Sequence, residues 1–474
     1  MKRIFILIVA VIALVGIDNA SAQSRTSYFM EGSYFRTDLN PALAPTRGYL
    51  ALPGTSGVGL DVPNNFLSVD NFIYQKDGQM VTALHKSVSA DEFLGKLPEL
   101  GRFGVNANVN ILGVGFHAGR SYWNFGLRVR STTDINISKD LFSAIKDFGN
   151  GDYNLTGTNV NSNNYLETYL GASFPVGQHL NIGVRGKFLV GLANIHTEFD
   201  RVAIGVNTDK LSATLRGMVV ANGVFVDQTK IASGAEIDIS KLMASNPMDM
   251  LKNFKSFGAA LDLGVEVKLL QDHLKVSAAI TDLGFIKWHS STNYAASAAY
   301  DLSFEGFDID AGELKFNFDD ELVNMAPSSE GYISQLNGAL NVGVEYNFLR
   351  NHFAIGVMSH TELYNHQLYT ELTASLNIRA TNWLSATVSH TFLAKHKLGV
   401  LGAALNIHPS VINIFIGADF IDTRYATYKG SPVPRYMNAL NLYAGVGFNF
   451  GRPKYIREAE REERRARREA RRVN

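Results

Sequence analysis

The chain has 474 residues, of which 46% are hydrophobic and 19% charged, and its 44 basic residues balance its 44 acidic ones. It has no cysteine, which excludes disulfides, thiolate catalysis and cysteine-ligated metals. Beyond the N-terminal apolar run, no stretch of the sequence approaches the roughly 20 apolar residues that a membrane-spanning helix needs, which excludes a helical membrane protein.

Residues 1–22 have the three parts of a cleavable export signal. Lys2 and Arg3 are basic, residues 4–16 are apolar, and Ala20-Ser21-Ala22 supplies the small residues that a signal peptidase reads. The apolar run, about 13 residues long, is too short to span a bilayer. We therefore expect cleavage before Gln23 and a mature protein in the outer membrane of a Gram-negative-type cell.

Residues 23–75 form the next expected unit, a periplasmic or plug-like segment. The stretch from Tyr28 to Asn71 contains four prolines and little alternation of polar and apolar residues, which predicts irregular backbone rather than membrane strands. A wide barrel has room for a channel unless something fills it. This segment, which includes the candidate plug motif Asn40, Pro41 and Ala42, is the obvious filler.

From residue 76 to residue 451 apolar and polar residues alternate with a period of two, the pattern of β-strands with two unlike faces. Clear examples are residues 103–111, 123–130, 261–269 and 336–348. Several segments run about 10 to 14 residues, close to what a tilted membrane strand needs. The pattern predicts an all-β fold, a transmembrane antiparallel β-barrel of about 14–16 strands.

The connections between the predicted strands sort by length. If successive strands alternate in direction, the short polar turns fall on one side, and the long connections, about 132–164, 227–257, 282–335 and 421–437, fall on the other. Short periplasmic turns with longer outer loops are typical of bacterial outer-membrane barrels, so both termini are expected in the periplasm. Residues 300–318 also alternate and would add one hairpin. The short turns lie near residues 76–78, 119–120, 177–178, 207–209, 271–272, 350–351, 381–382 and 408–410.

Two groups of potential metal ligands occur among these segments. A repeat places His360 and His366, then His390 and His396, where strands turn outward, so four imidazoles could meet at one rim. Two related hairpins with polar strand ends are the favoured interpretation. The acidic residues between 308 and 321 could hold calcium, but they do not match the full calcium loop, and a solvated loop is favoured.

No sequence motif of a hydrolase or of a phosphate-binding loop occurs. We therefore expect no enzymatic activity, no catalytic residues, no cofactor and no metal.

The last predicted strand, residues 440–450, ends in Phe448 and Phe450. A final strand that ends in Phe resembles the signal that the barrel-assembly machinery recognises. Here 24 residues follow Phe450, so the signal would be internal. The expected partners of the barrel are this machinery and outer-membrane lipid.

The tail, residues 452–474, carries ten basic and five acidic residues, which leaves 32 basic and 38 acidic ones between the signal segment and the tail. Glu460 with Arg464, and Glu463 with Arg467, are spaced as i, i+4 pairs on a helix. The tail has no apolar stripe, so it neither packs against a core nor lies in a membrane. We expect a short charged periplasmic helix, either solvated or in contact with an acidic partner, and no binding of nucleic acid.

Three segments resemble known families. Asn40-Pro41-Ala42 is similar to a segment that precedes or plugs barrels of the long-chain fatty-acid transporter type and the outer-membrane shuttle protein of type IX secretion. Asp282-Leu283-Gly284-Phe285, with Trp288, resembles a segment of uncharacterised outer-membrane barrels, a domain of unknown function, in gliding, type IX-secreting bacteria. Residues 186–191 resemble the same group. The order of these segments over most of the mature chain carries the resemblance, which implies a compartment and a fold more than an activity.

Two functions are consistent with these observations. The first is transport or diffusion of small molecules, including hydrophobic ones, through the lumen. The alternative is an accessory or scaffold barrel for the type IX secretion or gliding machinery. Whether the lumen is open distinguishes them.

Overall fold

The structure is a computed structural model. None of the described helices is long and apolar enough to cross a membrane. The described residues are 25–146, 152–207, 210–223, 254–290, 293–305, 326–327, 331–349, 351–364, 367–393, 398–421, 425–428, 431–434, 439–451, and 458, 461, 462, 464, 465 and 468. The predicted export signal, the acidic run 308–321, His366 and His396 lie outside them.

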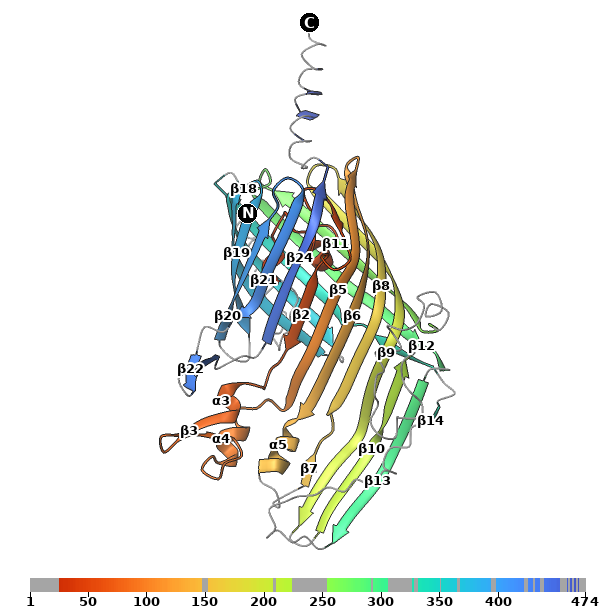
Figure 1. The fold of residues 1–474 in the computed structure, drawn as a ribbon, viewed down its shortest axis with the longest axis vertical. Helices are drawn as coiled ribbons and strands as arrows, with labels where there is room; N and C mark the ends of the chain where they lie inside the picture. Colours follow the sequence, from red (N-terminus) through yellow and green to blue (C-terminus); the bar gives the residue numbers. More distant parts are fainter. Residues whose placement is uncertain are drawn as a thin grey trace.

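The strands close into an antiparallel barrel with 14 strand positions, so the prediction of an all-β transmembrane barrel is confirmed (Figure 1). The wall consists, in order, of β1 (Gly48–Ala51) with β2 (Val58–Pro63), β5 (Leu100–Ala118), β6 (Ser121–Ser138), β8 (Asn159–Val176), β9 (Leu180–Asn207), β11 (Phe257–Leu269), β12 (Leu274–Trp288), β16 (Gly338–Phe348), β17 (Phe353–Tyr364), β18 (Gln367–Thr381), β19 (Leu384–Leu393), β20 (Leu398–Ile407), β21 (Ile412–Ile421) and β24 (Ala439–Phe450). Two short strands, β1 and β2, together occupy the first position. Each of them pairs with β5 in the second position and with β24 in the last.

The two faces of the wall have opposite polarity. Leu170, Ile355 and Ile416 are among the large apolar side chains exposed on the outside, whereas Asn124 and Glu167 are buried inside. Because successive residues of a strand point to opposite faces, period-two alternation produces this separation directly. An apolar outer band around a polar interior is the arrangement that a lipid bilayer requires of a barrel.

Residues 48–63, which the sequence analysis assigned to the plug, instead lie in the wall. Between β1 and β2 the chain leaves the regular ladder but still pairs, because Val446 donates its N–H to the Thr55 carbonyl (2.8 Å) and Asn110 donates to that of Gly57 (2.9 Å). A strand broken in this way shows no long alternation, and Pro53 and Pro63 add to the irregular pattern. The boundary expected at residue 75 therefore does not coincide with the start of the barrel.

Residues 64–99 form a small lobe at one end of the barrel (Figure 1). Its core includes Phe66, Phe72, Phe93 and Phe142, the last contributed by the connection after β6. The expected periplasmic turn at residues 76–78 belongs to a hairpin of this lobe, whose four-residue strands are too short to cross a membrane. The elements of the lobe are α3 (Val69–Phe72), β3 (Ile73–Lys76), β4 (Gln79–Thr82) and α4 (Ala90–Leu94), and α5 (Lys139–Lys146), from the connection after β6, packs against them.

β9 is 28 residues long and leaves the barrel halfway along its length. Its first part pairs with β11 in the wall, and its second part pairs with β10 (Lys210–Gly223), which pairs in turn with β13 (Asn293–Glu305). Residues 208 and 209 of the expected turn at residues 207–209 lie outside the described residues, but β9 and β10 on either side of it extend past the end of the barrel, so β10 and β13 add no strand to it (Figure 1). Other short strands outside the 14 positions are β7 (Asp152–Asn154), β14 (Ala326–Pro327), β15 (Tyr332–Gln335), β22 (Tyr425–Tyr428) and β23 (Ser431–Pro434).

The two ends of the barrel differ (Figure 1). One end, here called the turn mouth, carries the short turns after β5, β8, β11, β16, β18 and β20. The opposite end, here called the loop mouth, carries the lobe and β10. Gly119 and Gly177 have positive φ angles of 60° and 67°, which these tight turns require. The described residues of the C-terminal tail are helical and exposed.

Candidate functional site: the plugged lumen

Residues 25–47, here called the plug, lie inside the lumen near the turn mouth. The plug contains η1 (Arg25–Ser27) and α2 (Arg36–Leu39), and most of its residues are buried. Its aromatic residues pack on aromatic residues that point inward from the wall. The Tyr34 ring stacks on that of Tyr49 at 4.1 Å, and the Phe35 ring lies 4.1 Å from that of Phe415.

Asn40-Pro41-Ala42, the expected plug motif, forms a tight turn at the centre of the plug. The Asn40 side-chain oxygen accepts the Ala42 N–H (2.9 Å), and its amide nitrogen donates to the Tyr28 hydroxyl (3.2 Å). This internal bonding satisfies a fully buried Asn, which would otherwise be costly to bury.

The wall makes room for this turn at two glycines. A Cβ on Gly183 would lie 2.2 Å from the Pro41 carbonyl carbon, and one on Gly264 would lie 2.1 Å from the Asn40 side-chain oxygen. Neither position therefore accepts a side chain unless the plug moves.

Ion pairs join the plug to the wall. Asp38 pairs with Arg185 (2.6 Å) and Arg128 (3.0 Å), and Glu31 pairs with Lys275. Burial raises the pKa of Asp38, but Arg128 and Arg185 outweigh burial and hold it below its usual value. Asp38 is therefore docked as an anion between two guanidinium groups of the wall.

Asp38 belongs to a buried cluster of four basic and four acidic side chains. Its members bridge one another at 2.6–3.4 Å, as in the pairs of Arg128 with Glu167 (2.7 Å) and Arg130 with Asp282 (2.8 Å). Such balance suits a buried site, because each charge has a partner. The eight residues are Arg128, Arg130, Arg185, Lys187, Asp38, Glu167, Asp262 and Asp282.

Asp282, from the family-like motif, is a hub of this cluster. Its φ angle is 58°, and the register shift there sets Thr281 and Asp282 opposite the single residue Asp262, so both side chains are buried in the lumen. Asp282 accepts from Lys187 (2.6 Å) as well as from Arg130. The sequence offered no signal for this pairing beyond polar residues at alternate positions.

The other residues of the motif face outward or pack against neighbouring strands. Leu283 and Phe285 are exposed on the outer face, and a Cβ on Gly284 would lie 2.3 Å from the Ala259 carbonyl oxygen. Trp288 is fully buried, and its indole N–H donates to the Ser334 hydroxyl (2.8 Å).

A second charged group joins the plug to the far side of the lumen. Arg25 pairs with Glu371, and its backbone N–H donates to Asp419 (3.0 Å). Arg102 pairs with Asp134 (2.7 Å) and Glu362 (3.1 Å). This second group therefore contains four carboxylates and two guanidinium groups.

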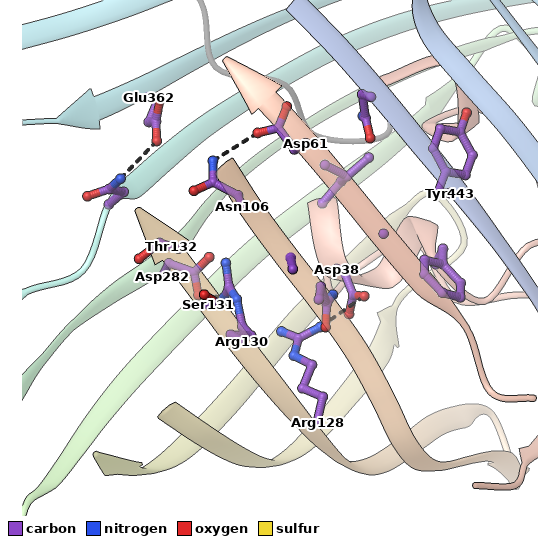
Figure 2. A pocket seen from close by; sticks show the side chains of 17 residues that line it. Asp38, Asp61, Asn106, Arg128, Arg130, Ser131, Thr132, Asp282, Glu362 and Tyr443 are labelled. Carbon is purple, nitrogen blue, oxygen red and sulfur yellow. Dashed lines mark hydrogen bonds and ion pairs between the residues drawn. The ribbon is translucent and has the colours of Figure 1, made fainter. Parts of the chain in front are cut away.

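A chamber with a cavity volume of about 130 Å³ lies between the plug and the loop mouth, and Figure 2 shows the side chains that line it. Phe35, Asp38 and Leu39 close it on the plug side. On the other side of the plug, a hollow of about 350 Å³ lies at the turn mouth and is lined in part by Glu31 and Lys275. The wall residues of the chamber are Gly59, Asp61, Asn106, Ala107, Asn108, Arg128, Arg130, Ser131, Thr132, Asp282, Asn337, Glu362, Asn441 and Tyr443.

The remaining sequence-predicted residues lie apart from the chamber. His360 is buried in the lumen with its Nδ1 2.6 Å from the Asn341 side-chain oxygen, whereas His390 is half-buried and lies against the Phe392 ring, which is exposed outside. The repeat thus places its two described imidazoles on opposite faces of the wall. Phe448 and Phe450 are exposed on the outer face of β24.

Comparison with known proteins gives one family match. Residues 41–419 match the profile of a family of unknown function (DUF5723). No curated protein matches the chain.

Among solved structures, the barrel is similar to the toluene transporter TodX of Pseudomonas putida, at 8% identity and a TM-score of 0.36 over 92% of this chain and 95% of that one. It is also similar to a FadL homologue of Pseudomonas aeruginosa, at 10% identity and a TM-score of 0.38 over 92% and 98%.

Proposed function

Since the chain belongs to the DUF5723 family, whose function is unknown, its role is argued from its own lumen, and we propose that it is an outer-membrane barrel that admits small solutes. The observation that carries the proposal is the chamber, a solute-sized space bounded by the plug and by polar wall residues. The closed wall leaves the lumen as the route, so passage requires the plug to shift.

The contacts that hold the plug are consistent with such movement. Many of them are ion pairs and hydrogen bonds, such as those of Asp38 and Glu31, and polar groups released from such contacts can pair with water instead. A hydrogen bond to a charged group therefore contributes only about 1.5 to 3 kcal/mol net. The plug can shift without disturbing the hydrogen-bonded ladder of the wall.

The lining of the chamber favours polar solutes. Arg130, Asp282 and Glu362 are among its charged residues, and asparagine, serine and threonine supply much of the rest. A hydrocarbon would cover these groups without offering them a partner, which is unfavourable. Hydrophobic solutes, which the resemblance to fatty-acid transporters implies, are the alternative that the experiment also tests.

The test is a permeation assay in liposomes with the full-length protein and two glycine variants of β9. Gly183→Val forces the plug to move, whereas Gly186→Val is the matched control, because a Cβ there meets nothing within 4 Å. We expect slow passage of small polar solutes through the wild type and the control, and passage several-fold faster through Gly183→Val. If no variant passes polar or hydrophobic solutes faster than protein-free liposomes, although all insert, the proposal is wrong.

A second candidate, an accessory barrel for type IX secretion or gliding machinery, is supported by the exposed, helical residues of the charged tail. A barrel with this role would remain impermeable in the same assay. Crosslinking from Arg461 or Arg465 in cells would then capture an acidic periplasmic partner, and deletion of residues 452–474 would abolish the capture.

A further inference from the structure

We propose that the chamber binds a small zwitterion, a molecule that carries both an ammonium and a carboxylate group, with a dipeptide as the best fit. This inference rests on the proposed function, because it names the class of solute that the lumen would admit. It is argued from two groups of residues on neighbouring strands of the wall.

The first group presents hydrogen-bond acceptors that lack donors. Asp61 on β2 is only 8% exposed, and one of its oxygens accepts from the Asn106 amide (2.9 Å). No described residue donates to its other oxygen, or to the side-chain oxygens of Asn106 and Asn108 on β5. Buried acceptors are nearly always paired in proteins, by protein groups or by water, so these three beside a cavity are available to a ligand that donates.

The donor that suits this group is an ammonium. Whereas an amide can be turned to present a hydrogen, an ionised Asp61 offers only acceptors. Its buried charge is favourable only with a cation beside it, and no ion pair within 4.0 Å is found for it among the described residues. An ammonium has three donors, one for each unpaired acceptor.

The second group presents a guanidinium. Arg130 on β6 stands directly opposite Asn108 in the register and lines the same chamber. Its bonds to Asp282 and Glu167 both use Nη1, and its side chain is 17% exposed, against 3% for Arg128 and none for Arg185. Arg130 is therefore the cation of the cluster best placed to receive a ligand carboxylate.

The separation of the two groups sets the length of the ligand. Asp61 and Arg130 lie on strands two positions apart, which separates their backbones by roughly 10 Å. Figure 2 shows Asp61 beside Asn106, and Arg130 apart from them beside Asp282. Each charge-assisted hydrogen bond takes up about 2.8 Å of this span, so the two charges of the ligand stand several ångströms apart. The termini of a dipeptide meet this requirement better than the adjacent charges of a single amino acid.

Binding to the full-length protein in detergent, measured by calorimetry, tests the inference. The probes are alanyl-alanine, its N-acetyl form, which lacks the ammonium, its C-terminal amide, which lacks the carboxylate, and free alanine. We expect alanyl-alanine to bind, and each of the other three to bind roughly tenfold more weakly or worse, since a bond to a charged group contributes about that factor.

Two variants assign the ends of the ligand. Asp61→Asn should abolish the preference for the free ammonium and keep that for the carboxylate, and Arg130→Gln should do the reverse. Glu92→Gln, in the lobe outside the lumen, is the control and should change neither. A loss of packing would weaken all probes alike, so the change in preference is specific to a binding role.

Equal affinity of all probes, or no binding of alanyl-alanine at millimolar concentration, would overturn the inference. The comparison of the four probes requires only the wild-type protein, so it tests the inference even if a variant fails to fold. Because binding is measured without a membrane, the two proposals fail separately. Dipeptide binding without permeation contradicts the proposed passage only, and permeation without a preference for zwitterions contradicts the present inference only.

Discussion

At the scale of single residues, the face on which a side chain stands decides what a substitution costs. Val446 and Gly447 are neighbours on β24, and the alternation that exposes Leu442 and Phe448 outside directs Val446 to the lipid and Gly447 to the lumen. An arginine at position 446 should cost about 2 to 4 kcal/mol, because a cation near the bilayer midplane has neither water nor a partner.

The adjacent substitution meets the plug instead. A Cβ on Gly447 would lie 3.1 Å from the Tyr34 ring, so Gly447→Arg should displace the plug while the barrel still inserts. Folding titrations of the two variants into lipid vesicles, together with protease accessibility of the plug, separate these effects. Impaired insertion of Gly447→Arg with normal insertion of Val446→Arg would mean that the two faces are exchanged.

At the scale of elements, the N-terminal segment divides into parts with different roles. Residues 25–47 lie inside the lumen, whereas β1 and β2 complete the wall by pairing with both β24 and β5. Deletion of residues 28–44 should therefore leave a barrel that inserts and conducts more. Deletion of residues 28–71 removes a strand position and should prevent closure, since the unpaired edges of β24 and β5 cannot enter lipid.

Heat-modifiable migration on gels and single-channel recording distinguish the two deletions. Equal assembly of both would show that the wall closes without β1 and β2. Failure of the shorter deletion to insert would instead assign the plug a part in folding.

At the scale of the whole molecule, the apolar outer band and the predicted N-terminal export signal both indicate the outer membrane. The mature chain should begin at Gln23 and fractionate with the outer membrane. Mass spectrometry of that fraction measures both properties at once. A chain that keeps Met1 and stays in the inner membrane would contradict the assignment.

The sequence by itself determined the kind of barrel. Alternation predicted the all-β fold and its two faces, because the side-chain period of a strand is a local property. It does not depend on which other strand pairs with it. The barrel has 14 strand positions, the lower end of the predicted range of about 14–16. Six of the eight expected short turns connect neighbouring strands of the wall at the turn mouth. The turn at residues 76–78 does not, and the strands that flank residues 207–209 extend beyond the wall, since alternation does not distinguish a strand in the wall from one beyond it.

Only the tertiary structure decided how the lumen is built. Whether β9 stays in the wall depends on its pairing with β11 and β10, which are separated from one another by more than thirty residues of chain. The sequence likewise indicated that Asp38, Arg130 and Asp282 are polar, but not that they converge. Their meeting depends on strand order and register, which are long-range properties, and the unpaired oxygen of Asp61 is visible only once its neighbours are known.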